Sequence, residues 1–243
     1  MSGTSALSGA TDVFALSGSG RCVAFFTARR RAALPKALAG RAVAGVAAEL
    51  ARLADEGWIL SVGGMFGRSE PPTAFATGFA QDADFVGAFE APGRAAALAG
   101  TARLGAAGWD ALLRTAWLLG PREFDPVPRT EAGSAPPAWG FFALWQWNAA
   151  WQAATPQERA AYDAECDVAF ASDVASGIGI AGRHRLDAAG RWHHLGIWEC
   201  PGFPVIDAAM REHERVADFK FTTSRHYAGR RTPLLDLLEP ADG

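Results

Sequence analysis

One eight-residue segment occurs twice in this chain. VGAFEAPG (86–93) returns as LGIWECPG (195–202), which pairs Gly87 with Gly196 at an offset of 109 residues. The same offset continues without a gap to Gly120 and Gly229. Self-similarity at a fixed spacing is typical of a duplicated structural unit. The chain is therefore predicted to contain two copies of one fold.

The second copy has the clearer pattern of elements. Residues 139–148 are an apolar, aromatic strand candidate, and TPQE (155–158) is a capping box that predicts a helix to about Val174. Residues 176–186 and 191–200 flank LDAAG, which predicts a β-hairpin. Apolar residues at helical spacing predict a further helix after Gly202. Residues 220–229 close the unit as a strand, so the order is βαββαβ.

The first copy has the same order. Its strand candidates are 22–29, 58–67, 82–91 and 115–120, and its helix candidates are 42–57 and 93–104. Residues 121–137 contain five prolines, which favours a linker. The predicted organisation is a flexible arm (1–20), a first unit (21–120), a linker (121–138), a second unit (139–230) and a tail (231–243).

The residues that both copies share are expected to be structural. Pro-Gly suits a strand-to-helix turn. Glu90 and Glu199 lie just before the expected helix, where a carboxylate can bond free backbone N–H groups. A catalytic pair of carboxylates is the alternative for these two residues.

Two tandem βαββαβ units resemble the dimeric α+β barrel superfamily in its fused, two-unit form, as in chlorite dismutase-like proteins. The resemblance covers about residues 21–230 and implies an α+β fold in which two ferredoxin-like units pack sheet to sheet. That superfamily includes haem enzymes such as chlorite dismutases, and also cofactor-free monooxygenases. The fold alone does not choose among these activities.

The two copies differ most in their histidines. All five histidines belong to the second copy: His184, His193, His194, His213 and His226. At the offset of 109, the first copy has Phe85, Leu104 and Trp117 where the second has His194, His213 and His226. The second copy is therefore predicted to be the active unit and the first a scaffold. The resemblance implies the same, because haem in the fused relatives usually lies in the C-terminal half.

Three groups of candidate site residues follow. His213 lies on the apolar stripe of its helix, which suits an axial haem ligand, and a core histidine is the alternative. His194, His226 and His193 lie on strands, where they can act as general acids or bases. Trp145, Trp147 and Trp198 are predicted to line a pocket for a flat apolar substrate, with core packing as the alternative. No metal other than haem iron is expected, and a site made of His184, His194 and His226 is a weaker alternative.

Composition narrows the functions further. The net charge of −3 gives no polyanion-binding surface, so nucleic acid is not an expected partner. No apolar run is long enough to span a membrane, and three scattered cysteines favour the cytoplasm. The expected function is a small-molecule enzyme that uses the sheet–helix cavity of the C-terminal unit, as a haem-dependent oxidoreductase or lyase. The alternatives are a cofactor-free monooxygenase or isomerase with a histidine base, and a non-catalytic binding or assembly module. Assembly into a homo-oligomer is left open.

Overall fold

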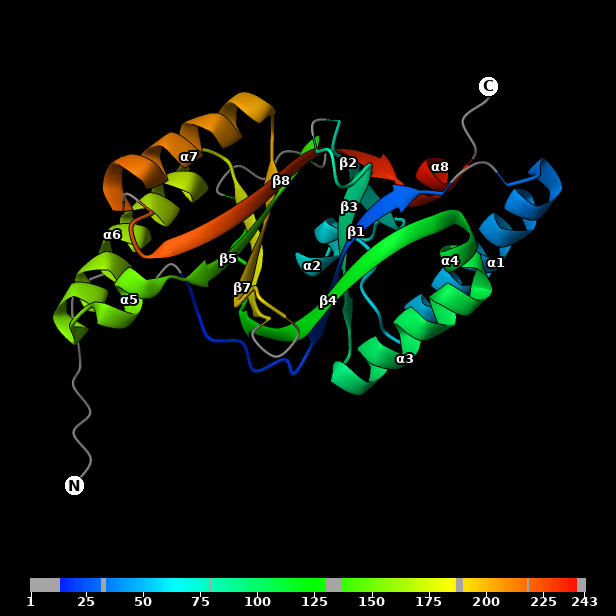
Figure 1. Cartoon of the computed structure of the whole chain (residues 1–243), viewed down its shortest axis with the longest axis horizontal. Coiled ribbons are helices and arrows are strands. Elements are labelled where there is room, and N and C mark those ends of the chain that lie inside the picture. Colours follow the sequence, from blue (N-terminus) through cyan, green and yellow to red (C-terminus); the bar gives the residue numbers. More distant parts are fainter. Residues whose placement is uncertain are drawn as a thin grey trace.

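The computed structural model describes residues 14–31, 34–78, 80–129, 137–186, 190–217 and 219–239. Both halves follow the predicted βαββαβ order (Figure 1). The first half comprises β1 (Cys22–Arg30), α1 (Lys36–Asp55), α2 (Val62–Met65), β2 (Thr73–Ala76), β3 (Phe85–Ala91), α3 (Arg94–Leu104), η1 (Gly105–Trp109), α4 (Asp110–Leu112) and β4 (Leu113–Phe124). The second half comprises β5 (Trp139–Trp147), α5 (Ala149–Ala153), α6 (Pro156–Ala175), β6 (Gly179–Arg185), β7 (His194–Cys200), α7 (Phe203–Ala217), β8 (Thr222–Pro233) and α8 (Leu234–Leu238).

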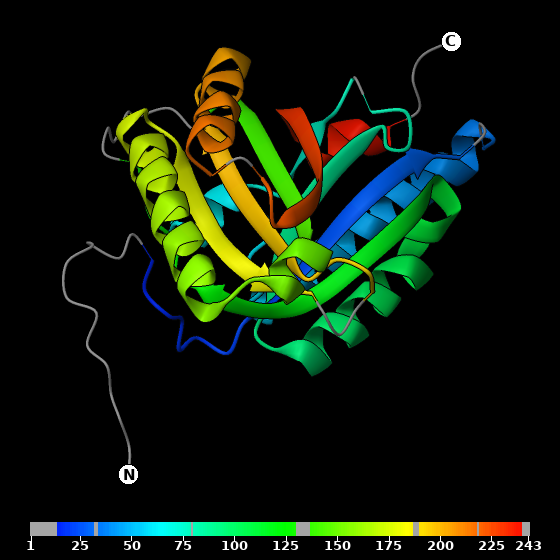
Figure 2. The ribbon, with the colours of Figure 1, turned by 60° about the vertical axis from the view of Figure 1, so that its left-hand side comes forward.

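The strands form one closed antiparallel barrel. Its order is β1-β3-β2-β8-β5-β7-β6-β4, so each half contributes a ferredoxin-like sheet with its first and third strands in the centre. The two sheets are joined where β2 pairs with β8 and where β4 pairs with β6. Figures 1 and 2 show the long helices outside the barrel, with α1 and α3 over the first half and α6 and α7 over the second, whereas the short α2 packs Val62 and Met65 into the barrel core. The predicted α+β barrel fold is confirmed.

Three predicted boundaries are wrong because the barrel needs longer strands. β4 runs to Phe124, four residues into the predicted linker, and pairs there with β6. β8 runs to Pro233 and continues as α8, within the predicted tail, because its end pairs with β2. Leu16, in the predicted flexible arm, forms a bridge with Phe124. Residues 1–13 of that arm lie outside the described residues.

The predicted strand at 58–67 is also wrong. Ser61 accepts a hydrogen bond from the backbone N–H of Gly64 at 2.9 Å, and this cap starts the short helix α2. Among the described residues, the backbone of this segment bonds to strands only at two points, through a bridge from Ile59 to Glu90 and a hydrogen bond from the N–H of Thr73 to the carbonyl oxygen of Leu60. The second strand of the first half is instead β2, which lies closer to β3 in sequence.

Glu90 and Glu199 do not cap helices, and both point into the barrel. Glu90 accepts hydrogen bonds from Arg122 (2.8 Å from Nε) and lies 2.9 Å from Nε2 of His184. Glu199 is bonded by Arg68 and Arg231. Arg122 and Arg231 are themselves equivalent at the offset of 109, so the repeat duplicates a buried Glu–Arg pair beside each joint between the sheets. These Glu–Arg pairs replace both the predicted capping role of Glu90 and Glu199 and the alternative of a catalytic carboxylate pair.

The barrel interior holds an apolar core that both halves build. Its members include Phe25, Phe75, Val86, Phe142 and Ile197. The opposite, outer face of each sheet packs against the helices of its own half. The two outer faces are where the halves differ.

Candidate functional site

In the first half, one side chain fills the space between sheet and helices. The ring of Phe26, on the central strand β1, contacts the rings of Phe85, Phe89, Trp109 and Trp117 at centroid distances of 5.1–6.3 Å. Across the strands Phe26 is paired with Gly87 on β3 and with Trp117 on β4. The space is closed by aromatic packing.

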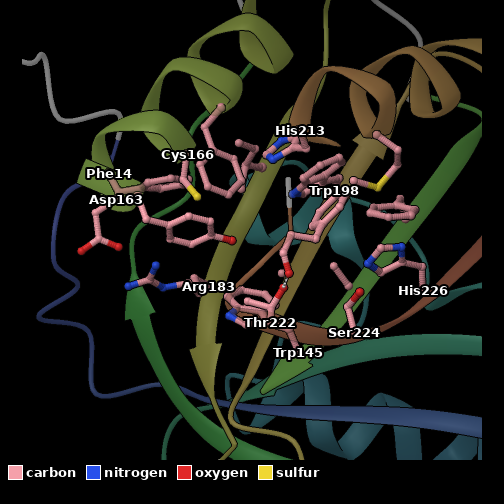
Figure 3. A pocket seen from close by; sticks show the side chains of 18 of the residues that line it. Phe14, Trp145, Asp163, Cys166, Arg183, Trp198, His213, Thr222, Ser224 and His226 are labelled. Carbon is pink, nitrogen blue, oxygen red and sulfur yellow. Dashed lines mark hydrogen bonds between the residues drawn. The ribbon is translucent and has the colours of Figure 1, made fainter. Parts of the chain in front are cut away.

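In the second half, the equivalent position is Ala143. Ala143 on β5 is paired with Gly196 on β7 and with His226 on β8, which are the counterparts of Gly87 and Trp117. An alanine here leaves a cavity of about 110 Å³ where the first half has a ring. The cavity is lined by Phe14, Phe141, Ala143, Trp145, Trp147, Tyr162, Asp163, Cys166, Phe170, Ile180, Gly182, Arg183, Gly196, Trp198, Met210, His213, Phe219, Thr222, Ser224 and His226 (Figure 3).

A buried His–Asp pair lies in the wall formed by the helices. Nε2 of His213, on α7, is 2.8 Å from Oδ2 of Asp173, on α6. Both side chains are almost fully buried, and burial raises the pKa of Asp173 while the hydrogen bond and charge of His213 oppose that rise. Because Asp173 takes Nε2, Nδ1 is the ring nitrogen left for a second partner.

The imidazole of His213 is surrounded by aromatic rings. Phe170 meets it edge-on at 4.9 Å and Trp198 lies at 5.6 Å. Phe219 stacks parallel to it at 6.5 Å and also lies 6.4 Å from the ring of His226. Phe219 has a left-handed φ of 45°, a conformation that is strained for a bulky residue. The chain therefore holds this ring beside both histidines at a cost to the backbone.

His226 lies in the wall formed by the sheet, on the outer face of β8. It lines the cavity and also a neighbouring groove of about 350 Å³ between α7 and the sheet. His226 keeps an exposed part, while partial desolvation of its ring and then the charge of His213 lower its pKa to about 4. A lowered pKa keeps His226 neutral near pH 7, so the ring can accept a proton or a hydrogen bond.

Charged groups lie at the other end of the cavity. In Figure 3, Asp163 and Arg183 lie on the side away from His226. Arg183 donates from Nε to Glu123 at 2.8 Å and stacks on Phe124. Cys166 lies beside them, and burial raises the pKa of its thiol to about 11, so this cysteine is not a ready nucleophile.

The structure divides the predicted site residues into two sets. His213, His226, Trp145, Trp147 and Trp198 line the cavity. His194 does not line it: its ring stacks on Trp145 at 5.1 Å, and burial with the charge of Arg183 lowers its pKa to about 4. His193 also lies outside the lining, where its Nδ1 accepts the backbone N–H of Trp147 at 3.2 Å.

The alternative three-histidine metal site is excluded by geometry. His184 points into the barrel and bonds Glu90, whereas His226 lies on the outer face of the sheet. Among the described residues, no group of three or more His, Cys, Asp or Glu side chains is arranged to hold a metal ion.

Haem does not fit the cavity as these side chains lie. The volume of about 110 Å³ is well below the roughly 300–1,000 Å³ of pockets that enclose drug-sized ligands. Nε2 of His213 is bonded to Asp173, and a planar macrocycle on Nδ1, next to the carbon that carries Cβ, would meet the helix backbone. Haem binding through Nε2 of His213 would require Asp173 to move.

Asp173 and Ala143 are two site residues that were not predicted from the sequence. Helices α1 and α6 each end before a glycine with a left-handed φ, 85° at Gly57 and 84° at Gly177. Counted back from these glycines, Asp173 occupies the position of Leu53. Aligning the halves by helix ends, rather than only by the offset of 109, would have found the buried aspartate.

No protein-family model matches the sequence, and no curated protein is similar enough to match it. Solved structures do match in fold. A mutant chlorite dismutase from Candidatus Nitrospira defluvii has a TM-score of 0.73 and 15% identity over 92% of this chain and 96% of its own. The same enzyme in complex with imidazole gives 0.70 and 15%, over 92% and 95%. The chlorite dismutase-like protein TA0507 gives 0.66 and 10%, over 90% and 97%.

These similarities show the fold. The chain has a chlorite dismutase-like dimeric α+β barrel along nearly its whole length. Within the described part of the chain, no helix has both the length and the apolar character needed to cross a membrane.

Proposed function

We propose that this chain is an enzyme that acts on a small apolar or aromatic molecule in the cavity of the second half, by proton transfer at histidine and without haem. The observation that carries this proposal is the contrast between two halves of one fold. Where the first half has Leu53, Leu104 and Trp117, the second has Asp173, His213 and His226 around a cavity.

The contrast argues for chemistry because the polar groups are not needed for folding. The first half forms the same sheet and helices with apolar residues at these positions. A buried ion pair is often no more stabilising than apolar residues of similar volume, because both charges lose their hydration. A function at the cavity accounts for keeping the Asp173–His213 pair.

The residues support a simple division of roles. Asp173 orients the imidazole of His213 through the contact between Oδ2 and Nε2. His226 is neutral and accepts a proton from a bound substrate, and Trp145 and Trp198 hold the substrate and exclude water. Proton removal of this kind supports isomerisation, or it activates an electron-rich substrate toward O₂.

A haem-dependent oxidoreductase or lyase is the second candidate. The fold shared with chlorite dismutase and the position of His213 on a helix beside the cavity favour it. The small volume and the Asp173 contact disfavour it. A non-catalytic binding module is the third candidate, and it differs in predicting ligand binding without turnover. The cytoplasmic location and the homo-oligomer stay predictions.

The test is a turnover screen on protein freed of metal by chelation and shown by absorbance to lack haem. Small aromatic and aliphatic compounds are incubated in D₂O under air, with deuterium incorporation followed by NMR and O₂ uptake by electrode. We expect turnover that falls at least about tenfold in His226→Gln and in His213→Leu. Glu212→Gln, on the same helix beside His213 but paired with Arg215 outside the cavity, is the matched control and keeps full activity. Turnover that survives both histidine substitutions would overturn the proposal.

A further inference from the structure

The first half shows what the cavity of the second half is shaped to hold. The Phe26 ring packs against Phe89 on β3 and Trp117 on β4. The counterparts of these two residues, Trp198 and His226, line the cavity above Ala143. Compared with the first half, the second half therefore lacks one six-membered ring, the counterpart of the Phe26 ring.

A glycine below this space supports the same conclusion. In the first half, a Cβ on Gly87 would overlap the Phe26 ring, so the ring requires glycine beneath it. The second half keeps Gly196 at this position, and Gly196 lines the cavity. A Cβ there would lie 3.4 Å from the Trp145 ring, an ordinary contact distance, so no ring of the chain lies as close to Gly196 as Phe26 does to Gly87.

The size of the cavity agrees. Its volume of about 110 Å³ compares with the roughly 150 Å³ of an engineered apolar cavity that binds benzene. The walls are aromatic, with Phe141 and Trp198 only 4.8 Å apart between ring centroids. A fused two-ring system would need more room than the side chains leave.

The polar neighbours specify a substituent on the ring. On the outer face of β8, Ser224 keeps the hydroxyl group that Thr115 has on β4, and His226 replaces Trp117. In the first half, Thr115 is already used by the indole N–H of Trp109 at 2.8 Å. Ser224 and His226 instead face the cavity. There they can accept a hydrogen bond from one hydroxyl group of a ligand and donate a hydrogen bond to it.

We infer that the cavity binds a single aromatic ring bearing a hydroxyl group, a phenol-class molecule, in the position that Phe26 occupies in the first half, with the hydroxyl toward His226. This inference rests on the proposed function for its role as substrate. Ala143 then sets specificity by leaving room for the ring.

The experiment measures binding by calorimetry and by tryptophan fluorescence with three probes: phenol, benzene and 2-naphthol. We expect phenol to bind wild type, benzene to bind more weakly and 2-naphthol not to bind. Ala143→Phe places a ring where the first half has Phe26. It should weaken phenol binding about 10–100-fold, which corresponds to the free energy of burying one aromatic ring. The variant should keep or raise the melting temperature, because Gly196 already provides the space. Phe26→Ala is the matched control in the first half: it opens an apolar cavity, which should bind benzene rather than phenol, and Phe26→Leu replaces it if that variant does not fold.

Two outcomes overturn the inference. One is absence of phenol binding to wild type at millimolar concentration while the Phe26 variant binds benzene. The other is phenol binding that is unchanged in Ala143→Phe. Turnover of a non-phenolic compound, with no phenol binding, would uphold the proposed function and reject the phenol-class ligand. Phenol binding that Ala143→Phe blocks, without turnover, would do the reverse.

Discussion

Oδ2 of Asp173 lies 2.8 Å from Nε2 of His213, and the two residues occupy the positions of Leu53 and Leu104 in the first half. Both leucines belong to the apolar core of that half. One fold therefore accepts either an apolar pair or a hydrogen-bonded His–Asp pair at the same place, which separates the demands of folding from those of function.

The first prediction concerns this exchange. Asp173→Leu or His213→Leu alone leaves one buried polar group without its partner and should lower the free energy of unfolding by about 3–5 kcal/mol. The double variant restores the first-half pattern and should match or exceed wild type, by up to about 4 kcal/mol. Urea denaturation at pH 7 measures all three. A double variant less stable than either single variant would show that the pair is structural.

The second prediction concerns acid stability. Burial opposes ionisation of Glu90, but the hydrogen bonds and charges of His184 and then Arg122 outweigh it and lower the pKa of Glu90 to about 2. Because the folded-state pKa lies below the usual value near 4.5, this carboxylate stabilises the fold above pH 4.5, and the contribution is lost as pH falls toward 2. It amounts to something on the order of 3 kcal/mol.

Glu90→Gln should therefore be less stable at pH 6 and should show a flatter loss of stability between pH 4.5 and 2. Urea titrations at several pH values measure this slope. Glu214→Gln, which changes an exposed carboxylate on α7, is the control and should keep the wild-type slope. A wild-type slope in Glu90→Gln would contradict the assignment.

The third prediction concerns the joints of the barrel. A Cβ on Gly120 would overlap the carbonyl oxygen of Arg185, where β4 meets β6, and one on Gly229 would lie 2.8 Å from the carbonyl oxygen of Ala76. Gly120→Ala and Gly229→Ala should both lower the melting temperature, with the larger drop at Gly120. Gly40→Ala, in open space on α1, should raise stability by up to about 1 kcal/mol. Equal effects at Gly120 and Gly40 would show that the joint tolerates a side chain.

The repeat predicted the topology well because the residues that both copies share determine the path of the backbone. Gly87, Gly120 and Gly229 lie where a ring or a neighbouring strand comes too close for a side chain. The Glu–Arg pairs could not be predicted as such, since Glu90 and Arg122 meet only when the barrel closes around them.

The candidate site was only partly predictable for a similar reason. Histidines and tryptophans mark chemistry by residue type, so His213, His226 and Trp198 could be named from sequence. Alanine has no functional group, so Ala143 gives no signal in the sequence. It matters only because it lacks the ring that Phe26 has at the equivalent position. His194 was misplaced because strand alternation gives its face of the sheet but not the Trp145 ring that stacks on it.

The fourth prediction concerns haem. Hemin added to wild type should give no stoichiometric Soret band of a histidine-ligated haem, because Asp173 holds Nε2 of His213 and the cavity is small. An absorbance titration measures this. A one-to-one band that disappears in His213→Leu would contradict the present account and would support the haem-dependent candidate.

The most direct test of the central claim, that a small molecule binds beside His213 and His226 in the second half, is a titration of histidine-labelled protein with phenol, followed through the ¹⁵N shifts of the imidazole rings. We predict that His213 and His226 shift with saturation, that His226 is neutral at pH 7, and that His184, inside the barrel, does not respond. Shifts confined to other histidines, or none at phenol concentrations that saturate binding, would contradict the account.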